Sequence, residues 1–170
     1  MSIEELDAGA VRARAGELAR LLLDAHASGM ALGLAAPLTF DDARDAYLGT
    51  ADRLAPGERI LLAALDGGEL VGAVQVDRAH APNGRHRAEL RRLAVRADRR
   101  GAGIGRALVA AAVERSRDAG LRLLWLTTHD GTVADRFYEQ LGWTRAGVIE
   151  DWATLPDGSL AGNAFFYLRL

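Results

Sequence analysis

The sequence predicts a mixed α/β fold in which a central, mostly antiparallel β-sheet is flanked by helices. Short apolar runs bounded by turn residues alternate along the chain with amphipathic helical segments, in the order β-α-α-β-β-β-α-β-α-β-β. No internal repeat, linker or low-complexity segment interrupts this order. The length of 170 residues, with 49% hydrophobic and 26% charged residues, predicts a single domain over residues 1–170.

The N-terminal part of the chain predicts a short strand at residues 3–6 and a helix at residues 10–27. Apolar residues recur in the helix at steps of three and four: Val11, Ala15, Leu18, Leu22 and Ala25. Gly29 is typical of the position just after a helix, where a left-handed residue ends the last turn.

A second helix and a hairpin follow. Thr39, with Asp42 three residues later, predicts a capping box at the start of a helix that ends before Pro56. The runs at residues 59–65 and 69–76 are separated by Asp-Gly-Gly, which is typical of a β-hairpin turn.

The central part of the chain predicts a strand at residues 87–95, a long helix at 104–119 and a buried strand at 121–127. Thr132, with Asp135 three residues later, predicts the cap of a short helix that runs to Leu141.

The chain ends in a predicted antiparallel hairpin. Its two strands, at residues 148–155 and 164–170, lie on either side of a Pro-Asp-Gly turn. This hairpin completes the predicted sheet.

Composition excludes several kinds of chemistry. The absence of cysteine excludes disulfides, thiolate metal sites and a cysteine nucleophile. Lysine is also absent, which excludes a P-loop and a lysine Schiff base. The histidines show no metal-ligand spacing, so no metal site is expected. With no apolar run of about 20 residues and no signal-like N-terminus, we expect a cytoplasmic protein that does not enter membranes.

A glycine-rich segment, Arg-Arg-Gly-Ala-Gly-Ile-Gly-Arg at residues 99–106, lies between a predicted strand and a predicted helix. Its alternate glycines allow close approach of the backbone to a ligand, and the free N–H groups of the helix start favour an anion such as a pyrophosphate. Arg100 and Arg106 flank the segment and could neutralise phosphate charge. A dinucleotide-binding GxGxxG motif is excluded because Arg106 or Leu108 stands where its last glycine is needed. A glycine-rich turn without a ligand remains the alternative.

Two motifs in register resemble those of the GNAT superfamily of N-acetyltransferases. The first is Leu-Ala-Val at residues 93–95, followed by the R-x-x-G-x-G pattern at 100–105. The second comprises Ala134, Phe137, Tyr138, Gly142 and Trp143. Within the superfamily, the chain looks similar to the tabtoxin-resistance acetyltransferase group. The resemblance implies a GNAT-type domain.

The resemblance also implies acetyl-CoA as co-substrate. The strand edge would bind its pantetheine, and the glycine-rich loop would bind its pyrophosphate. The family often makes a further contact through an asparagine where Gly131 stands here, and that contact is either lost or replaced by Thr132 or His129. The cofactor-binding residues implied are Leu93, Ala94, Val95, Arg100, Gly101, Ala102, Gly103, Ile104, Gly105, Arg106, Thr132 and Tyr138.

Glu89 and Tyr138 are the candidate catalytic residues. Strict alternation along the strand would place Glu89, Arg91, Leu93 and Val95 on one face, with Glu89 near the pantetheine as general base. A surface glutamate paired with arginine is the alternative. Tyr138 matches the family tyrosine that protonates the leaving thiolate, and a core aromatic residue is its alternative.

The expected activity is transfer of an acetyl group from acetyl-CoA to the primary amine of a small molecule, directly in a ternary complex. A protein or peptide N-acetyltransferase and a non-catalytic acetyl-CoA-binding module are the alternatives. An apolar segment at residues 30–38 could close the pocket over a small acceptor.

His129, Asp151 and Trp152 could contact substrate, or be ordinary loop and hairpin residues. The net charge of −2 argues against nucleic acid as a partner, and a homodimer is left open.

Overall fold

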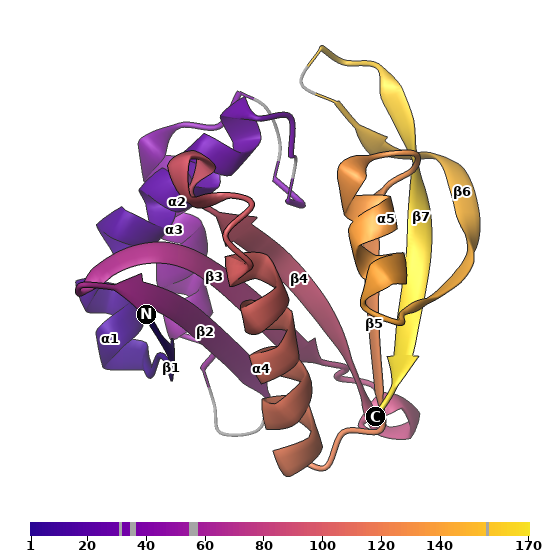
Figure 1. The fold of residues 1–170 in the computed structure, drawn as a ribbon, viewed down its shortest axis with the longest axis horizontal. Helices are drawn as coiled ribbons and strands as arrows, with labels where there is room; N and C mark the ends of the chain where they lie inside the picture. Colours follow the sequence, from indigo (N-terminus) through magenta and orange to yellow (C-terminus); the bar gives the residue numbers. More distant parts are fainter. Residues whose placement is uncertain (31, 35–36, 55–57, 156) are drawn as a thin grey trace.

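The computed structural model describes residues 1–30, 32–34, 37–54, 58–155 and 157–170. Within these ranges the strands form one sheet with the order β1-β2-β3-β4-β5-β7-β6 (Figure 1). The elements are β1 (Ser2–Glu5), α1 (Ala8–Ala13), α2 (Ala15–Ala27), α3 (Phe40–Ala51), β2 (Arg59–Asp66), β3 (Glu69–Arg78), η1 (Pro82–Gly84), β4 (Arg87–Val95), η2 (Ala97–Arg99), α4 (Ile104–Asp118), β5 (Leu123–His129), α5 (Val133–Gln140), β6 (Thr144–Thr154) and β7 (Leu160–Arg169). The predicted fold class is confirmed.

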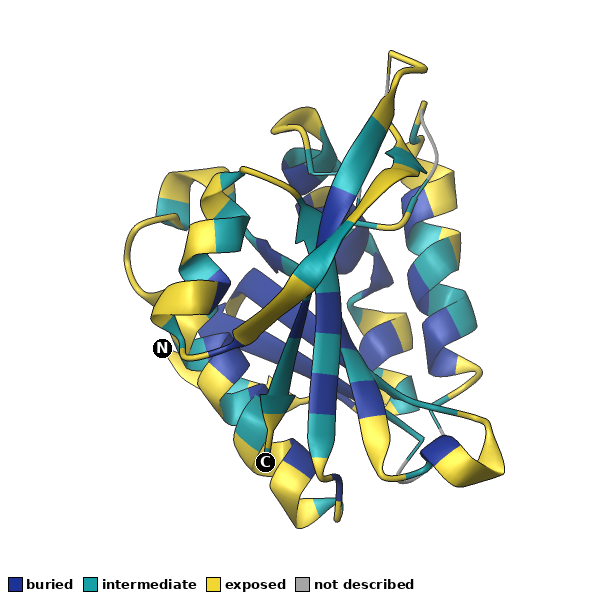
Figure 2. Cartoon of the chain, turned by 90° about the vertical axis from the view of Figure 1, so that its right-hand side faces the viewer, coloured by how far each residue is buried: buried dark blue, intermediate teal, exposed yellow. Residues whose placement is uncertain are grey.

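Helices cover both faces of the sheet. One hydrophobic cluster joins α4 and α5 to one face, with Leu108, Leu124 and Phe166 fully buried at its centre. A second cluster joins α1, α2 and α3 to the other face around Leu18, Tyr47 and Leu61. Figure 2 shows this arrangement as buried strands at the centre, with the exposed residues on the outer sides of the helices and at the tip of the β6–β7 hairpin. No helix in the described ranges is long and apolar enough to cross a membrane.

The strands β4 and β5 pair over only part of their length. They are parallel neighbours at three positions, the last of which pairs Glu89 with Trp125. Beyond this pair the two strands diverge, as Figure 1 shows. Within the part of the chain that the structure describes, the remainder of β4 therefore has no strand partner on the β5 side, and this free edge ends at the glycine-rich loop.

The predicted helix at residues 10–27 is broken into α1 and α2. Arg14 lies at the junction with φ −101° and ψ 10°, outside helical geometry, and its guanidinium donates to Glu17 and to the backbone oxygen of Gly68. The apolar periodicity continues through the break, because Val11, Ala15 and Leu18 are all buried. The sequence pattern therefore predicted the buried face but could not show the change of direction.

Two predicted helix caps have different outcomes. The Thr39–Asp42 capping box is confirmed, with both reciprocal hydrogen bonds present at the start of α3. Thr132 does stand at the N-cap of α5, but its hydroxyl donates to the backbone oxygen of His129 instead of capping the helix. Asp135 accepts a hydrogen bond from the N–H of Gly131.

The closing hairpin is longer than predicted, because β6 begins at Thr144 and β7 at Leu160. Irregular pairing in β6, between Arg145 and Gly147 and between Ile149 and Ala153, interrupts the alternation that marks a strand in a sequence. Of the predicted turn, Pro156 lies outside the described residues, as do residues 56 and 57 after α3.

Candidate active site

The glycine-rich loop has a backbone that requires glycine at two positions. Gly101 and Gly103 have φ values of 81° and 80°, in the left-handed region that other residues adopt only with strain. Gly103 is the N-cap of α4 and supplies no side-chain cap. A helical hydrogen bond joins the Ala107 N–H to the Gly103 oxygen. The N–H groups of residues 104–106 precede this bond in the chain, so they have no partner within the helix. The loop can therefore present several N–H groups to an anion.

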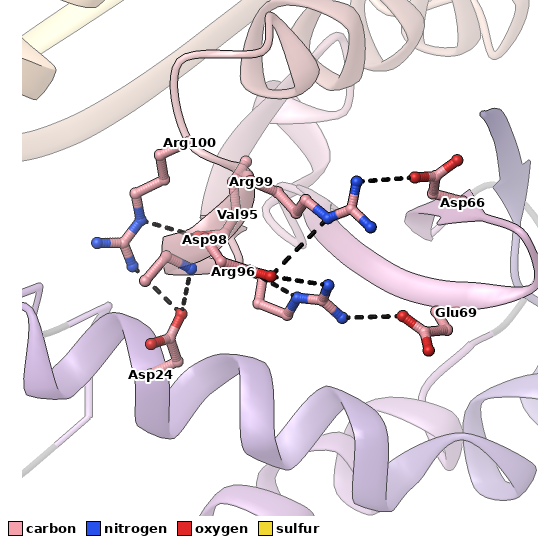
Figure 3. A network of polar contacts seen from close by, with 9 residues as sticks. Asp24, Asp66, Glu69, Val95, Arg96, Asp98, Arg99 and Arg100 are labelled. Carbon is pink, nitrogen blue, oxygen red and sulfur yellow. Dashed lines mark hydrogen bonds and ion pairs between the residues drawn. The ribbon is translucent and has the colours of Figure 1, made fainter.

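Ion pairs and hydrogen bonds fix the base of this loop (Figure 3). Arg100 donates to the backbone oxygen of Val95 at 2.9 Å and to Ser28 at 2.9 Å, and it lies 3.4 Å from an oxygen of Asp24. Asp24 also accepts the Ala97 N–H at 2.7 Å. Further ion pairs hold the same segment: Arg96 with Asp98 and Glu69, and Arg99 with Asp66. Arg96, Arg99 and Arg100 therefore anchor the loop to α2 and to the β2–β3 hairpin.

The two arginines expected to neutralise phosphate differ in the structure. The Arg100 guanidinium contacts protein groups at the base of the loop. Arg106 is exposed on the first turn of α4, and no ion pair joins it to a described carboxylate. Arg106 is thus the better placed of the two for a phosphate.

The backbone around the loop has the groups that an extended ligand with a pyrophosphate needs. A Cβ on Gly105 would lie 3.6 Å from Phe137 of α5 and 3.8 Å from Val95 of β4, so α4, α5 and β4 come close together at this glycine. The unpaired edge of β4 can hydrogen-bond to amides, and the start of α4 can bind the charge. The residues present therefore fit the pantetheine and pyrophosphate of acetyl-CoA.

A β-bulge overturns the expected arrangement of side chains on β4. Arg92 has φ 52°, and the register with β3 shifts so that Arg92 and Leu93 oppose the single residue Val74. Leu93 and Val95 consequently pack on the α4 side of the sheet, while Glu89 and Arg91 face the opposite side. The prediction that all four share one face is wrong, because alternation holds only within an uninterrupted strand.

Glu89 lines a cleft of about 590 Å³ on the face of the sheet that α3 partly covers. Its side chain is 27% exposed, and its carboxylate lies 3.9 Å from Arg91. Arg91 also lies 3.6 Å from Asp77, which stands opposite Glu89 on β3. Burial raises the pKa of Glu89, Arg91 opposes the rise and Asp77 adds to it. A half-buried carboxylate of raised pKa in a cleft is suited to accept a proton near neutral pH.

Sequence reasoning missed the residues that complete this cleft. Asp77 supplies a second carboxylate beside Glu89, and Arg59 donates to it at 2.6 and 2.9 Å. Trp125 and Phe165, stacked with centroids 6.5 Å apart, form an aromatic wall. The register of β3 against β4 brings Asp77 to Glu89. The sequence gives one indication of a role for Asp77, which is that it stands at the polar end of the otherwise apolar strand β3.

Tyr138 lies on the other side of the sheet, in the cluster beneath α5. The residue is 6% exposed and contacts the rings of Phe137, Trp143 and Phe166. Burial raises its pKa well above the usual value for tyrosine, so the phenol stays protonated at neutral pH. Among the described residues no hydrogen-bond partner is found for its hydroxyl. Tyr138 is therefore a core aromatic residue whose neutral hydroxyl is available to donate a hydrogen bond.

The other candidate residues lie at the edges of the site. The His129 ring nitrogen Nδ1 lies 2.9 Å from the side-chain oxygen of Asn163, which gives it a structural contact. Trp152 is 51% exposed and meets Phe165 edge-on at 4.9 Å. Asp151 is exposed on the irregular part of β6 with φ 53°. Within the described ranges, no group of three or more histidine and acidic residues could hold a metal ion.

Comparison with known proteins agrees with this geometry. The sequence matches the family model of the Acetyltransferase (GNAT) family over residues 28–143, which is more than half of the chain. The chain belongs to the GNAT family. Membership makes this GNAT protein an acyltransferase whose donor is acetyl-CoA.

Solved structures share its fold over essentially the full chain. The ribosomal-protein-alanine N-acetyltransferase from Brucella melitensis matches with a TM-score of 0.83 and 22% identity, covering 100% of both chains. The structure of yncA from Salmonella typhimurium, which contains its cofactor acetyl-CoA, matches with a TM-score of 0.79 and 18% identity over 100% of this chain and 94% of that one. The aminoglycoside 6'-acetyltransferase type Ii matches with a TM-score of 0.72 and 24% identity over 99% and 97%. At these identities the likeness establishes the fold alone.

Proposed function

We propose that this GNAT protein transfers the acetyl group of acetyl-CoA to the primary amine of a small molecule bound in the Glu89 cleft. The observation that carries the proposal is the position of Glu89. It is the last residue of β4 that pairs with β5, so it lies where the free edge of β4 begins. The donor edge and the acceptor cleft therefore meet at this residue, as direct transfer in a ternary complex requires.

The dimensions of the cleft favour a small acceptor. Its volume of about 590 Å³ lies within the range typical of small-molecule sites. Part of the segment at residues 30–38 approaches it, because a Cβ on Gly33 would lie 3.1 Å from the Arg91 guanidinium; residues 31, 35 and 36 lie outside the described ranges. The names of the similar structures include both a protein acetyltransferase and an aminoglycoside acetyltransferase, so the fold does not choose between these acceptors.

The donor side of the site has a distinct set of residues. The backbone of residues 93–95 would bind the pantetheine amides, and the N–H groups of residues 101–106 would bind the pyrophosphate, with Arg106 adding charge. Thr132 would close the site at the start of α5. Acetyl-CoA supplies the acetyl thioester that the amine attacks.

The two catalytic residues would act from opposite faces of the sheet. Glu89 accepts a proton from the amine as the new C–N bond forms. Tyr138 donates a hydrogen bond to the sulfur as the C–S bond breaks. Full proton transfer from Tyr138 to a thiolate is uphill, because a phenol is a weaker acid than a thiol and burial raises the pKa of Tyr138 further. Stabilisation of the departing thiolate is therefore the role we assign to it.

Substitution of Glu89 tests the proposal. In an assay of thiol release with a panel of amines, Glu89→Gln should lower kcat by about 10²- to 10⁴-fold, the usual contribution of a general base, without changing acetyl-CoA affinity. Glu114→Gln, at an exposed position on α4, is the matched control. The base must be deprotonated to act, so wild-type kcat/KM should rise with pH through a pKa above that of ordinary glutamate. Retention of both turnover and this acid limb in Glu89→Gln would remove Glu89 from the mechanism.

A further inference from the structure

Positive charge is concentrated in the acceptor cleft of a protein whose net charge is −2. Two carboxylates, Asp77 and Glu89, line the cleft together with five arginines and a histidine. The basic residues are Arg53, Arg59, Arg78, His80, Arg87 and Arg91. A site built only to attract the ammonium form of an amine would have the opposite balance of charge.

The pairing within the cleft shows which arginines have compensating charges. Arg59 makes two hydrogen bonds to Asp77, and Arg91 lies between Asp77 and Glu89 at 3.6 and 3.9 Å. These contacts use both carboxylates of the cleft. No ion pair joins Arg53, Arg78 or Arg87 to a carboxylate of the described residues. Arg78 has one end of its guanidinium bound to the backbone oxygen of Ala119 at 2.6 Å.

Arg53 and Arg87 are therefore the exposed arginines of the cleft that form no ion pair with any described carboxylate. Arg87 lies two residues before Glu89 on the same face of β4, at a spacing of roughly 7 Å along a strand. That distance is within the length of one small molecule that places its amine at Glu89. A guanidinium binds a carboxylate through two parallel hydrogen bonds, which makes arginine well suited to orient such a group.

We propose that the cleft binds an amine that also carries a carboxylate, as a free amino acid does, with the carboxylate held by Arg87 and Arg53 and the amine at Glu89. The inference rests on the proposed function for the fate of the amine, but binding of the carboxylate is independent of it. The aromatic wall of Trp125 and Phe165 would contact the apolar part of the acceptor. A diamine would place a second positive charge against these arginines and should be a poor acceptor.

The test compares free amino acids with their own amides, which differ only in the loss of the negative charge. Alanine, methionine and phenylalanine, each with its amide, would be titrated by calorimetry into protein saturated with CoA and assayed for acetylation with acetyl-CoA. We expect the acid of at least one pair to bind at least tenfold more tightly and to react with at least tenfold greater kcat/KM than its amide. The amide has the less basic amine, so more of it is neutral at pH 7.5, and any bias from protonation opposes the expected result.

Variants locate the carboxylate. In the double variant Arg53→Gln/Arg87→Gln, the ratio of the affinity for the acid to that for the amide should fall at least tenfold. Arg117→Gln, at an exposed position on α4, should leave this ratio unchanged. Circular dichroism and the acetyl-CoA affinity of each variant would confirm that it is folded.

The outcomes separate this inference from the proposed function. Tight, Arg87-dependent binding of the acid without acetylation would support the inference and refute the transferase proposal. Acetylation of amides, diamines or a peptide amine as fast as of the acids would support transfer and overturn the inference. Equal or absent binding of acid and amide in all three pairs would also overturn it.

Discussion

Replacement of Gly103 by alanine is the most direct test of the donor site. Gly103 has φ 80°, and a Cβ there would have no other atom within 4 Å, so alanine introduces conformational strain without a clash. A left-handed conformation costs a residue with a Cβ roughly 1–2 kcal/mol. For a protein of this size, 1 kcal/mol corresponds to about 2–4 °C, so Tm should fall by about 2–8 °C.

The functional effect should be larger than the loss of stability suggests. If the backbone relaxes out of the left-handed region, the peptide between Gly103 and Ile104 rotates and misdirects at least one N–H of the helix start. A hydrogen bond to a charged group contributes about 1.5–3 kcal/mol, and about 1.4 kcal/mol corresponds to tenfold in affinity. KM for acetyl-CoA should therefore rise at least about tenfold in steady-state assays, with little change in kcat.

The other end of the same helix offers a matched control. Gly120 follows α4 with φ 74° and also has no atom within 4 Å of its missing Cβ. Gly120→Ala should lower Tm by a similar amount and leave KM for acetyl-CoA unchanged. If Gly103→Ala binds acetyl-CoA normally despite the lower Tm, or if Gly120→Ala weakens binding equally, the N–H groups of this loop do not hold the pyrophosphate.

Two further predictions concern buried tyrosines. Tyr138→Phe should lower kcat by about 10- to 100-fold, because one hydrogen bond to developing charge is lost. Its melting curve should remain close to that of the wild type, because no described residue forms a hydrogen bond with this hydroxyl. Wild-type turnover would contradict the role assigned to Tyr138. Tyr47 is fully buried, its hydroxyl has no partner among the described residues, and burial raises its pKa to about 12. Tyr47→Phe should therefore leave the free energy of unfolding in urea unchanged or raise it by about 1–3 kcal/mol, and a clear decrease would show that the hydroxyl has a partner.

The features predicted correctly from the sequence depend on residues close together in the chain. The bounds of β4 coincide with the prediction, and the capping box at Thr39 involves residues only three positions apart. The glycine-rich loop was predictable for the same reason, because left-handed backbone and free N–H groups are properties of a short segment. Local signals of this kind predict the secondary structure of each segment, and the order of the predicted segments along the chain predicts the fold class.

The features that were missed depend on contacts between distant segments. Nothing near Arg92 in the sequence indicates a residue with positive φ, since arginine is rarely found there. Its conformation is stabilised from α3, where its guanidinium lies over the ring of Tyr47 at 5.9 Å and its Nη1 is 3.5 Å from Thr50. Asp77 likewise reaches Glu89 only through the register of β3 and β4.

The bulge at Arg92 links the fold to the proposed chemistry. On a regular strand, Leu93 would point to the same side as Glu89, and the side chains at the donor edge would project into the acceptor cleft. The extra residue turns Leu93 and Val95 into the core beneath α4 and leaves Glu89 facing the cleft with Arg91. Because β4 also separates from β5 just beyond Glu89, the proposed mechanism has donor and acceptor approach from opposite faces of the sheet and meet at this carboxylate. The bulge at Arg92, which α3 contacts through Tyr47 and Thr50, thus leaves Glu89, the proton acceptor that we propose, beside the point where the edge of β4 becomes free.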